Sequence, residues 1–394
     1  MLLQERLLLL FTILILLSWC YVDLVHGLAA KAQKNKKILA SGAGKGFGAS
    51  TAPTFSHTPD TSPSIQTLTQ FLTAQKALGV QQGVVEVGVD NETGRRGLFA
   101  VTNIKKGQVV CMIPSDVALA LSDPAKMGDD APTMAHGGLN YLKMYANNPQ
   151  AREMWKPYLD TLPTRDSPQF DPTPDFFSDE EIELLEFPRL INLIRQRKTD
   201  LETVSKENRM DFDELQFATW LVSSRAFNIN LSDDGEQPDE ETQYDERGQV
   251  IAKAGSGLKS IRVMVPFLDL VNCDCTSPNC RFSMIDPKKD EAFFALEANR
   301  PIPAGNEIKI NYRSGVYSSV ELLLNYGFVP EDNNVDSWLL TKKDGDDMIA
   351  NLDDWTTTLE EDRRMIKMME GEPDGPLKKI LAFRTKMKEA YKTN

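Results

Sequence analysis

The stretch Val265-Pro-Phe-Leu-Asp269-Leu-Val-Asn272-Cys273-Asp-Cys-Thr-Ser-Pro-Asn-Cys280 lies between two short apolar runs, at residues 261–265 and 280–284, which are predicted to be strands. It contains three of the five cysteines of the chain, at positions 273, 275 and 280. This spacing is not typical of a disulfide framework. Three thiols could hold a metal ion, but a structural zinc site needs a fourth ligand and none lies nearby in the sequence. We therefore expect no metal site here.

Further strands are predicted on both sides of this stretch, where short apolar or alternating runs are bounded by Gly and Pro. They lie at residues 84–89, 108–113, 117–121, 292–297 and 307–311. Between the two groups of strands, apolar residues recur at helical spacing from about residue 138 onward. The pattern predicts an α+β fold, in which a β-rich unit is split by a helical insertion at about residues 124–227.

Several helices are predicted from amphipathic spacing. In the insertion, Asp211 precedes a helical run and is followed three residues later by Glu214, which is the pattern of a capping box. The last two helices form a small helical C-terminal lobe at residues 331–394. The predicted helices lie at residues 64–78, 180–197, 211–227, 356–369 and 376–392.

The histidine and charge counts exclude several classes of function. Of three histidines, His26 and His57 fall in a leader-like region, which leaves His136, in a loop of small residues, as the only histidine of the body. A zinc centre with several histidines is therefore excluded, and a catalytic triad would have to use His136, which we interpret as structural. The 44 Lys and Arg against 57 Asp and Glu give a net charge of −13. This charge argues against nucleic-acid binding and is compatible with a basic protein partner.

The first 65 residues have the composition of a leader. An apolar run at residues 7–22 is shorter than the roughly 20 residues of a membrane span and favours a signal peptide over residues 1–27. Residues 28–65 are basic, hydroxylated and poor in acids, which is typical of a transit peptide or a disordered linker. We expect a two-part leader to a plastid, with order beginning near Pro63. The alternatives are the secretory pathway and a retained N-terminal membrane anchor.

Four segments of the body, in this order, resemble the SET-domain protein methyltransferases, and within them the plant Rubisco large-subunit lysine methyltransferase type. The resemblance covers residues 66–394, with the SET domain at residues 66–330. The segments are Gly94-Arg-Arg-Gly97-Leu98-Phe-Ala100, Ser223-Ser224-Arg225-Ala226-Phe227, the 265–280 stretch, and Gly305-Asn-Glu307-Ile-Lys-Ile310-Asn311-Tyr312 with the following Glu321-Leu-Leu-Leu-Asn-Tyr326-Gly327-Phe328.

The resemblance implies a SET fold and transfer of a methyl group from S-adenosyl-L-methionine to a lysine of a non-histone protein. From the acidic charge we expect no nucleic-acid partner, and we expect no stable membrane association once the leader is removed. Two alternatives stay open, a catalytically inactive SET-like binding module and a protein-histidine methyltransferase. Methyl transfer to an amine depends mainly on alignment and on an unprotonated amine, so it needs neither histidine nor metal.

The resemblance also implies roles for individual residues. Tyr312 would align the methyl group and the amine, and Ser224 and Asp269 would lie near the incoming amine. Arg225 would meet the carboxylate of the donor. The residues implied to bind the donor are Gly94, Arg96, Leu98, Arg225, Asn272, Cys273, Tyr326 and Phe328.

The sequence departs from the family pattern in two places. The family reads Asn-His where this chain reads Asn272-Cys273. If the family's histidine acts through its main chain, a cysteine can replace it, because backbone groups do not depend on the side chain. The C-terminal lobe is also short beside that of the Rubisco-type enzymes, so the identity of the substrate is not implied.

Overall fold

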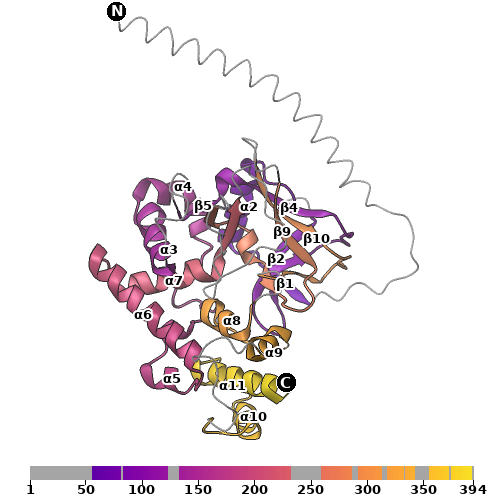
Figure 1. The fold of residues 1–394 in the computed structure, drawn as a ribbon. Coiled ribbons are helices and arrows are strands. Elements are labelled where there is room, and N and C mark those ends of the chain that lie inside the picture. Colours follow the sequence, from indigo (N-terminus) through magenta and orange to yellow (C-terminus); the bar gives the residue numbers. More distant parts are fainter. Residues whose placement is uncertain are drawn as a thin grey trace, which may run out of the picture. The chain divides into compact units, whose positions relative to one another are not determined.

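The computed structural model describes residues 56–80, 83–122, 133–231, 259–285, 292–312, 317–331, 333–341, 355–371 and 374–392 (Figure 1). The predicted signal peptide, residues 28–55 of the predicted transit-like segment and the acidic run at residues 233–247 lie outside these ranges. No helix within the described ranges has both the length and the apolar composition needed to cross a bilayer.

One mixed sheet forms the centre of the described fold. Its neighbouring strands are β1 (His57–Pro59), β2 (Val85–Asp90), β3 (Arg96–Ala100), β11 (Glu307–Ile310), β9 (Cys280–Ile285), β10 (Phe293–Ala298) and β4 (Val109–Pro114). A short strand, β8 (Asn272–Cys273), pairs in parallel with β11. Parallel pairing of β11 with β8 and with β9 brings the 265–280 stretch beside the segment that leads to Tyr312. The paired residues are 30 or more positions apart in the chain.

A second, antiparallel sheet has the order β5 (Leu119–Ala120), β7 (Lys259–Met264) and β6 (Ala226–Leu231). The sequence predicted that the helix of the insertion would continue to residue 227, but it ends at Arg225 and β6 begins at Ala226. Pairing of Ala226 with Met264 and of Phe227 with Val263 overrides the local helical pattern.

The α+β class and the helical character of the insertion are confirmed. Asp211 caps its helix by accepting a hydrogen bond from the Glu214 N–H at 2.9 Å. The predicted helix at residues 376–392 is observed with those bounds. The helices are α2 (Pro63–Ala74), α3 (Met134–Tyr141), α4 (Pro149–Leu159), α5 (Asp179–Glu183), α6 (Pro188–Asn208), α7 (Phe212–Arg225), α8 (Ser319–Tyr326), α9 (Asn334–Thr341), α10 (Leu359–Met368) and α11 (Pro376–Lys392).

His136 lies in α3 and not in the predicted loop. Thr133 caps this helix and its hydroxyl lies 2.9 Å from the His136 Nδ1. The neighbouring glycines serve helix packing, because a Cβ on Gly138 would lie 2.4 Å from Thr219 Oγ1 and 2.7 Å from the Thr219 N. Small residues that suggested a loop are therefore the surface on which α3 approaches α7.

His57 belongs to the sheet and not to a leader, so the described fold includes residues before the predicted start of order near Pro63. Thr58 of β1 pairs with Val89 of β2. The His57 ring stacks on Phe99 with centroids 4.0 Å apart, and its Nε2 lies 2.9 Å from the Glu86 Oε1. A three-residue strand has no readable period, and it is stable here because it adds to an existing edge.

The C-terminal helices share a core with the insertion. Buried side chains of α5 and α6, such as Ile182 and Leu190, pack in one cluster with Ile380 and Phe383 of α11. Because both sets of helices bury their apolar faces against each other, the predicted C-terminal lobe does not have a core of its own.

A buried carboxylate joins α8 to α9. Asp336 accepts hydrogen bonds of 2.6 Å from both the backbone N–H and the hydroxyl of Ser319. Burial raises the pKa of Asp336 to about 6, the two Ser319 bonds oppose this shift, and the charge of Glu321 adds to it. The protonated form is therefore favoured in the folded protein relative to the unfolded chain.

We expect Asp336→Asn to remove a pH-dependent part of the stability. The contribution of Asp336 is fully present below its unfolded pKa near 3.8 and is lost as the pH rises through its folded pKa of about 6. Two pKa units correspond to about 3 kcal/mol. Asparagine keeps an acceptor and cannot ionise. The free energy of unfolding of the variant, relative to that of wild type, should therefore rise by about this much as the pH increases from 4 to 7. Urea unfolding of both proteins at several pH values measures the difference, and parallel curves would contradict it.

Candidate active site

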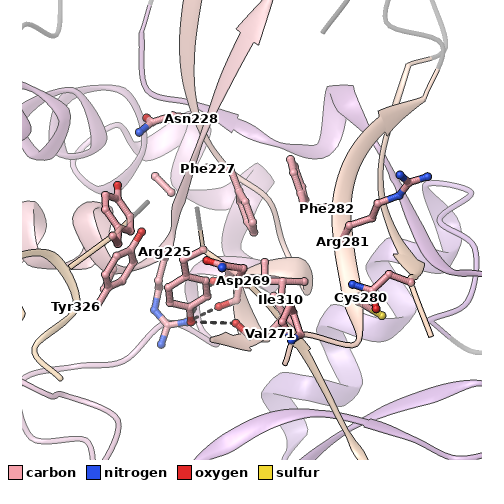
Figure 2. Close-up of a pocket in the computed structure, with 17 residues that line it drawn as sticks. Arg225, Phe227, Asn228, Asp269, Val271, Cys280, Arg281, Phe282, Ile310 and Tyr326 are labelled. Atoms are coloured by element: carbon pink, nitrogen blue, oxygen red, sulfur yellow. Dashed lines mark hydrogen bonds and ion pairs between the residues drawn. The ribbon is translucent and has the colours of Figure 1, made fainter. Parts of the chain in front are cut away.

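Two cavities meet in the region between α7, the 265–280 stretch and α8. The larger, of about 650 Å³, is called here the Asn272 cavity because that residue lies in its wall. The smaller, of about 560 Å³, is called the Phe282 cavity and is shown in Figure 2. Five residues line both cavities: Ser224, Arg225, Asp269, Tyr312 and Tyr326. They form the boundary at which a molecule in one cavity would meet a molecule in the other.

Elements that are distant in the sequence bring these five residues together. Ser224 and Arg225 end α7, Asp269 lies in the short helix η4 (Leu268–Leu270), and Tyr326 ends α8. Tyr312 lies two residues after the end of β11, and β11 is held beside β8 by the pairing of Ile310 with Cys273. The sequence-predicted catalytic and substrate residues therefore do lie at one place.

Tyr312 has a buried and oriented hydroxyl group. The hydroxyl donates a hydrogen bond of 3.0 Å to the backbone carbonyl of Val271, and the ring centroid lies 4.7 Å from that of Tyr326. Burial raises the pKa of Tyr312 far above its ordinary value, and the neighbouring thiol of Cys273 contributes to the shift. The hydroxyl therefore stays protonated at neutral pH and can both donate and accept hydrogen bonds.

Asp269 and Arg225 form an ion pair with each other. The Arg225 Nη1 lies 3.3 Å from both the Oδ2 and the backbone carbonyl of Asp269 (Figure 2). The Tyr158 hydroxyl donates a 2.9 Å hydrogen bond to the same carboxylate oxygen. Burial raises the pKa of Asp269, while Arg225 and Tyr158 oppose this shift. Two buried atoms, Arg225 Nε and Asp269 Oδ1, have no hydrogen-bond partner among the described residues.

Asn272 fastens the wall of its cavity. Its Nδ2 donates to the Arg96 carbonyl at 3.0 Å and to the Glu307 Oε1 at 2.6 Å, which ties β8 to β3 and β11. The two side chains approach Gly97 so closely that a Cβ there would lie 2.5 Å from Glu307 Oε1 and 2.9 Å from Asn272 Nδ2. A glycine is therefore required at position 97 in this arrangement.

The other predicted donor-binding residues lie at the Asn272 cavity, with one exception. Gly94, Arg96, Cys273 and Phe328 line it. Leu98 does not, because its side chain is fully buried and its backbone lies between β2 and β11 in the sheet. The position of Leu98 in a central strand directs its side chain to the core, and the backbone contact with the donor that the resemblance implies for it stays a prediction.

Some residues of the site were not predicted as site residues. Tyr158 reaches Asp269 from α4, and Glu307 holds Asn272 from β11. Phe227 and Phe282 stack at the Phe282 cavity, with centroids 4.3 Å apart and planes 11° apart. Phe227 and Glu307 stand in two of the four segments that resemble the family, and this is the signal that could have found them.

The three thiols of the 265–280 stretch do not form a metal centre in the described structure. Within the described ranges, no three His, Cys, Asp or Glu side chains are grouped so that they could hold a metal ion. Cys273 and Cys275 lie close together, with their sulfur atoms 3.5 Å apart, while Cys280 is buried at the start of β9.

Comparison with known protein families identifies the family to which the chain belongs. A family model described as the SET domain matches residues 95–313, which is more than half of the chain. The chain belongs to the SET-domain family. The matched SET domain contains β3, the helical insertion, the 265–280 stretch and Tyr312.

Solved structures show the same SET fold. The SET domain of LSMT bound to lysine and AdoHcy has 17% sequence identity to this chain and a TM-score of 0.56, and the match covers 85% of this chain and 90% of that one. Rubisco LSMT bound to AdoMet also has 17% identity, with a TM-score of 0.55 and coverage of 84% and 90%. Identity at this level supports the fold alone. A search of curated protein sequences found no match to the chain.

Proposed function

We propose that this SET-domain protein transfers a methyl group from S-adenosyl-L-methionine to the lysine side chain of a non-histone protein. The observation that carries the proposal is that Tyr312, whose hydroxyl is buried, lines both cavities. An in-line transfer between two separately bound molecules needs such an arrangement, because the two reacting atoms must approach from opposite sides.

The Asn272 cavity has the groups that an S-adenosyl-L-methionine molecule requires. The buried Arg225 Nε has no hydrogen-bond partner among the described residues, and its N–H could donate a hydrogen bond to the carboxylate of S-adenosyl-L-methionine. Tyr326 and Phe328 offer aromatic faces, which suit a sulfonium cation. When bound, the donor supplies a methyl carbon that is electrophilic because the neighbouring sulfur is positively charged.

The Phe282 cavity has the character expected for a lysine side chain. Aromatic rings of Phe227, Phe282, Tyr317 and Tyr326 line it and would pack along the aliphatic stem. Removal from water lowers the pKa of the amine and favours its neutral form. Because Arg225 and Asp269 neutralise each other, neither charge by itself would hold the amine in its protonated form.

Tyr312 is the group that positions the reaction. Its neutral hydroxyl, directed by the Val271 carbonyl, lies at the boundary and can accept hydrogen bonds from groups on either side. The amine lone pair forms the new N–C bond while the S–C bond breaks and its electrons stay on sulfur. One proton of the amine then passes to water. Alignment and exclusion of water supply the catalysis.

Purified protein tests this proposal directly. We expect titration calorimetry to detect binding of S-adenosylhomocysteine, and we expect labelled S-adenosylmethionine to label a protein in a cell lysate. Acid hydrolysis of the labelled product should release methyl-lysine. Recovery of methyl-histidine would contradict the assigned acceptor, and failure to bind S-adenosylhomocysteine would contradict an active donor site.

We also propose that the protein reaches a plastid by a two-part leader. The support is the signal-like run at residues 7–22 followed by the basic, acid-poor segment from residue 28. Since β1 begins at His57, trimming must stop before that residue to keep the sheet edge. N-terminal sequencing of the native protein should find a start between residues 28 and 57, and a native protein that begins at Met1 would contradict the proposal.

A further inference from the structure

Two neighbouring thiols, of which Cys273 lines the Asn272 cavity, are placed for a reversible disulfide. Cys273 and Cys275 are half-buried free cysteines whose sulfur atoms lie 3.5 Å apart. Residues separated by two positions have Cα atoms at most about 7 Å apart. The Cα atoms of disulfides usually lie about 4.4–6.8 Å apart, and this range falls within that limit.

The pKa of the Cys275 thiol is lowered, whereas those of the other described cysteines are raised. A hydrogen bond from Cys273 lowers the pKa of the Cys275 thiol, and the same bond, with burial, raises the pKa of Cys273. Burial raises the pKa of Cys280 to about 12 and raises that of Cys111 further. A thiolate is the form that reacts with oxidants, so Cys275 is the first thiol to react and Cys273 is its neighbour.

We propose that Cys273 and Cys275 are a redox pair, and that their disulfide weakens binding in the Asn272 cavity. The inference about binding rests on the function proposed above. The oxidant is a hydroperoxide such as hydrogen peroxide. The Cys275 sulfur attacks one peroxide oxygen, the O–O bond breaks, and a sulfenic acid and one water form. The Cys273 sulfur then attacks the Cys275 sulfur and displaces the second water, so that two thiols are oxidised and one peroxide is reduced.

The turn that carries the two thiols is hydrogen-bonded to the end of β11 and to Asn311, which precedes Tyr312. The Asp274 N–H donates to the Ile310 carbonyl at 2.9 Å, and the Asn311 Nδ2 donates to the Cys275 carbonyl at 3.4 Å. The Cys273 sulfur also accepts from the backbone N–H of Tyr312. Formation of the bond brings the sulfur atoms from 3.5 Å to about 2.05 Å. This movement takes the Cys273 side chain, which lines the cavity, toward Cys275 and changes its contact with Tyr312.

Oxidation of the full chain followed by peptide mass mapping tests the bond itself. We expect mild hydrogen peroxide to remove two hydrogen atoms from the peptide that contains residues 273 and 275, and a dithiol reductant to restore them. We expect calorimetry to show S-adenosylhomocysteine binding at least about tenfold weaker to the oxidised protein, and recovery on reduction. Cys275→Ser should bind like the reduced wild type and lose the response, since Cys275 does not line the cavity.

A matched control is Cys111→Ala, which removes a thiol in β4 and should keep the full response to peroxide. Failure to find the 273–275 bond, or equal affinity of the oxidised and reduced proteins, would overturn the inference. If the bond forms but the reduced protein does not bind S-adenosylhomocysteine, the donor-site proposal fails and the effect on binding fails with it, while the redox pair stands.

Discussion

Replacement of Tyr312 by Phe is expected to lower the rate of methyl transfer by about 10²–10³-fold, the usual effect of removing one oriented hydrogen-bonding group from a reacting centre. The hydroxyl lies where the two cavities meet and is directed by the Val271 carbonyl. Phenylalanine keeps the ring and its contact with Tyr326 but cannot orient the methyl group or the amine. Single-turnover labelling with S-adenosylmethionine measures the rate, and calorimetry with S-adenosylhomocysteine should show binding changed by less than about threefold.

Tyr145→Phe is the matched control for this variant. The Tyr145 hydroxyl also donates to a backbone carbonyl, that of Ala120 at 2.9 Å, but it lines neither cavity. Both variants lose the same atom and the same kind of hydrogen bond, so any general loss of stability should be similar. Labelling by Tyr312→Phe at the wild-type rate would refute the assigned role, as would equal losses in the two variants.

Asp362→Ala is expected to lower the free energy of unfolding by about 3–5 kcal/mol, because it removes the carboxylate that pairs with the buried Lys388 and one of the two carboxylates that pair with Arg384. Asp362 is fully buried in α10, and its carboxylate contacts the Lys388 Nζ and lies 3.3 Å from the Arg384 Nε. Both cations are themselves buried on α11. Lys388 also lies 4.8 Å from the centroid of the Trp355 ring, which offsets only part of its desolvation.

Glu360→Ala on the same helix is the control for this prediction. Its carboxylate lies 3.5 Å from Lys392, and both side chains are exposed, so the loss should be at most about 1 kcal/mol. Urea unfolding of the two variants and wild type at neutral pH gives both values. A loss for Asp362→Ala as small as that for Glu360→Ala would mean that water reaches the cluster. Because α11 shares its core with the insertion, the unfolding transition should stay cooperative in both variants.

Helices and most strands could be predicted because their signals are local. The cap at Asp211 is next to the helix that it starts, and Pro376 is the first residue of α11. In each helix the apolar spacing is also read from residues within the helix itself. The His57 strand, the end of α7 and the helix around His136 could not, because each is decided by a partner far away in the sequence. Pairing with Val89 and Met264 and the close packing on Thr219 supply what the local pattern does not contain.

The candidate site, like the fold, could be predicted from the sequence only in part. Tyr312, Asn272, Asp269 and the other motif residues were found because their order along the chain resembles a family, and the structure places all of them except Leu98 at the two cavities. Roles assigned one residue at a time did not show that Arg225 and Asp269 pair with each other, or that Tyr158 joins them. Hydrogen bonding between buried groups depends on three-dimensional distance, which the spacing in the sequence does not encode.

By itself, the sequence determined the α+β class, the helical insertion and the identity of the residues around which the site is built. It could do so because periodicity, caps and motifs are properties of neighbouring residues. Only the tertiary structure decided that two cavities meet at Tyr312, that Cys273 and Cys275 face each other beside one of them, and that β1 completes the sheet. These features arise from contacts between distant segments, whose geometry is set by the packing of the whole chain.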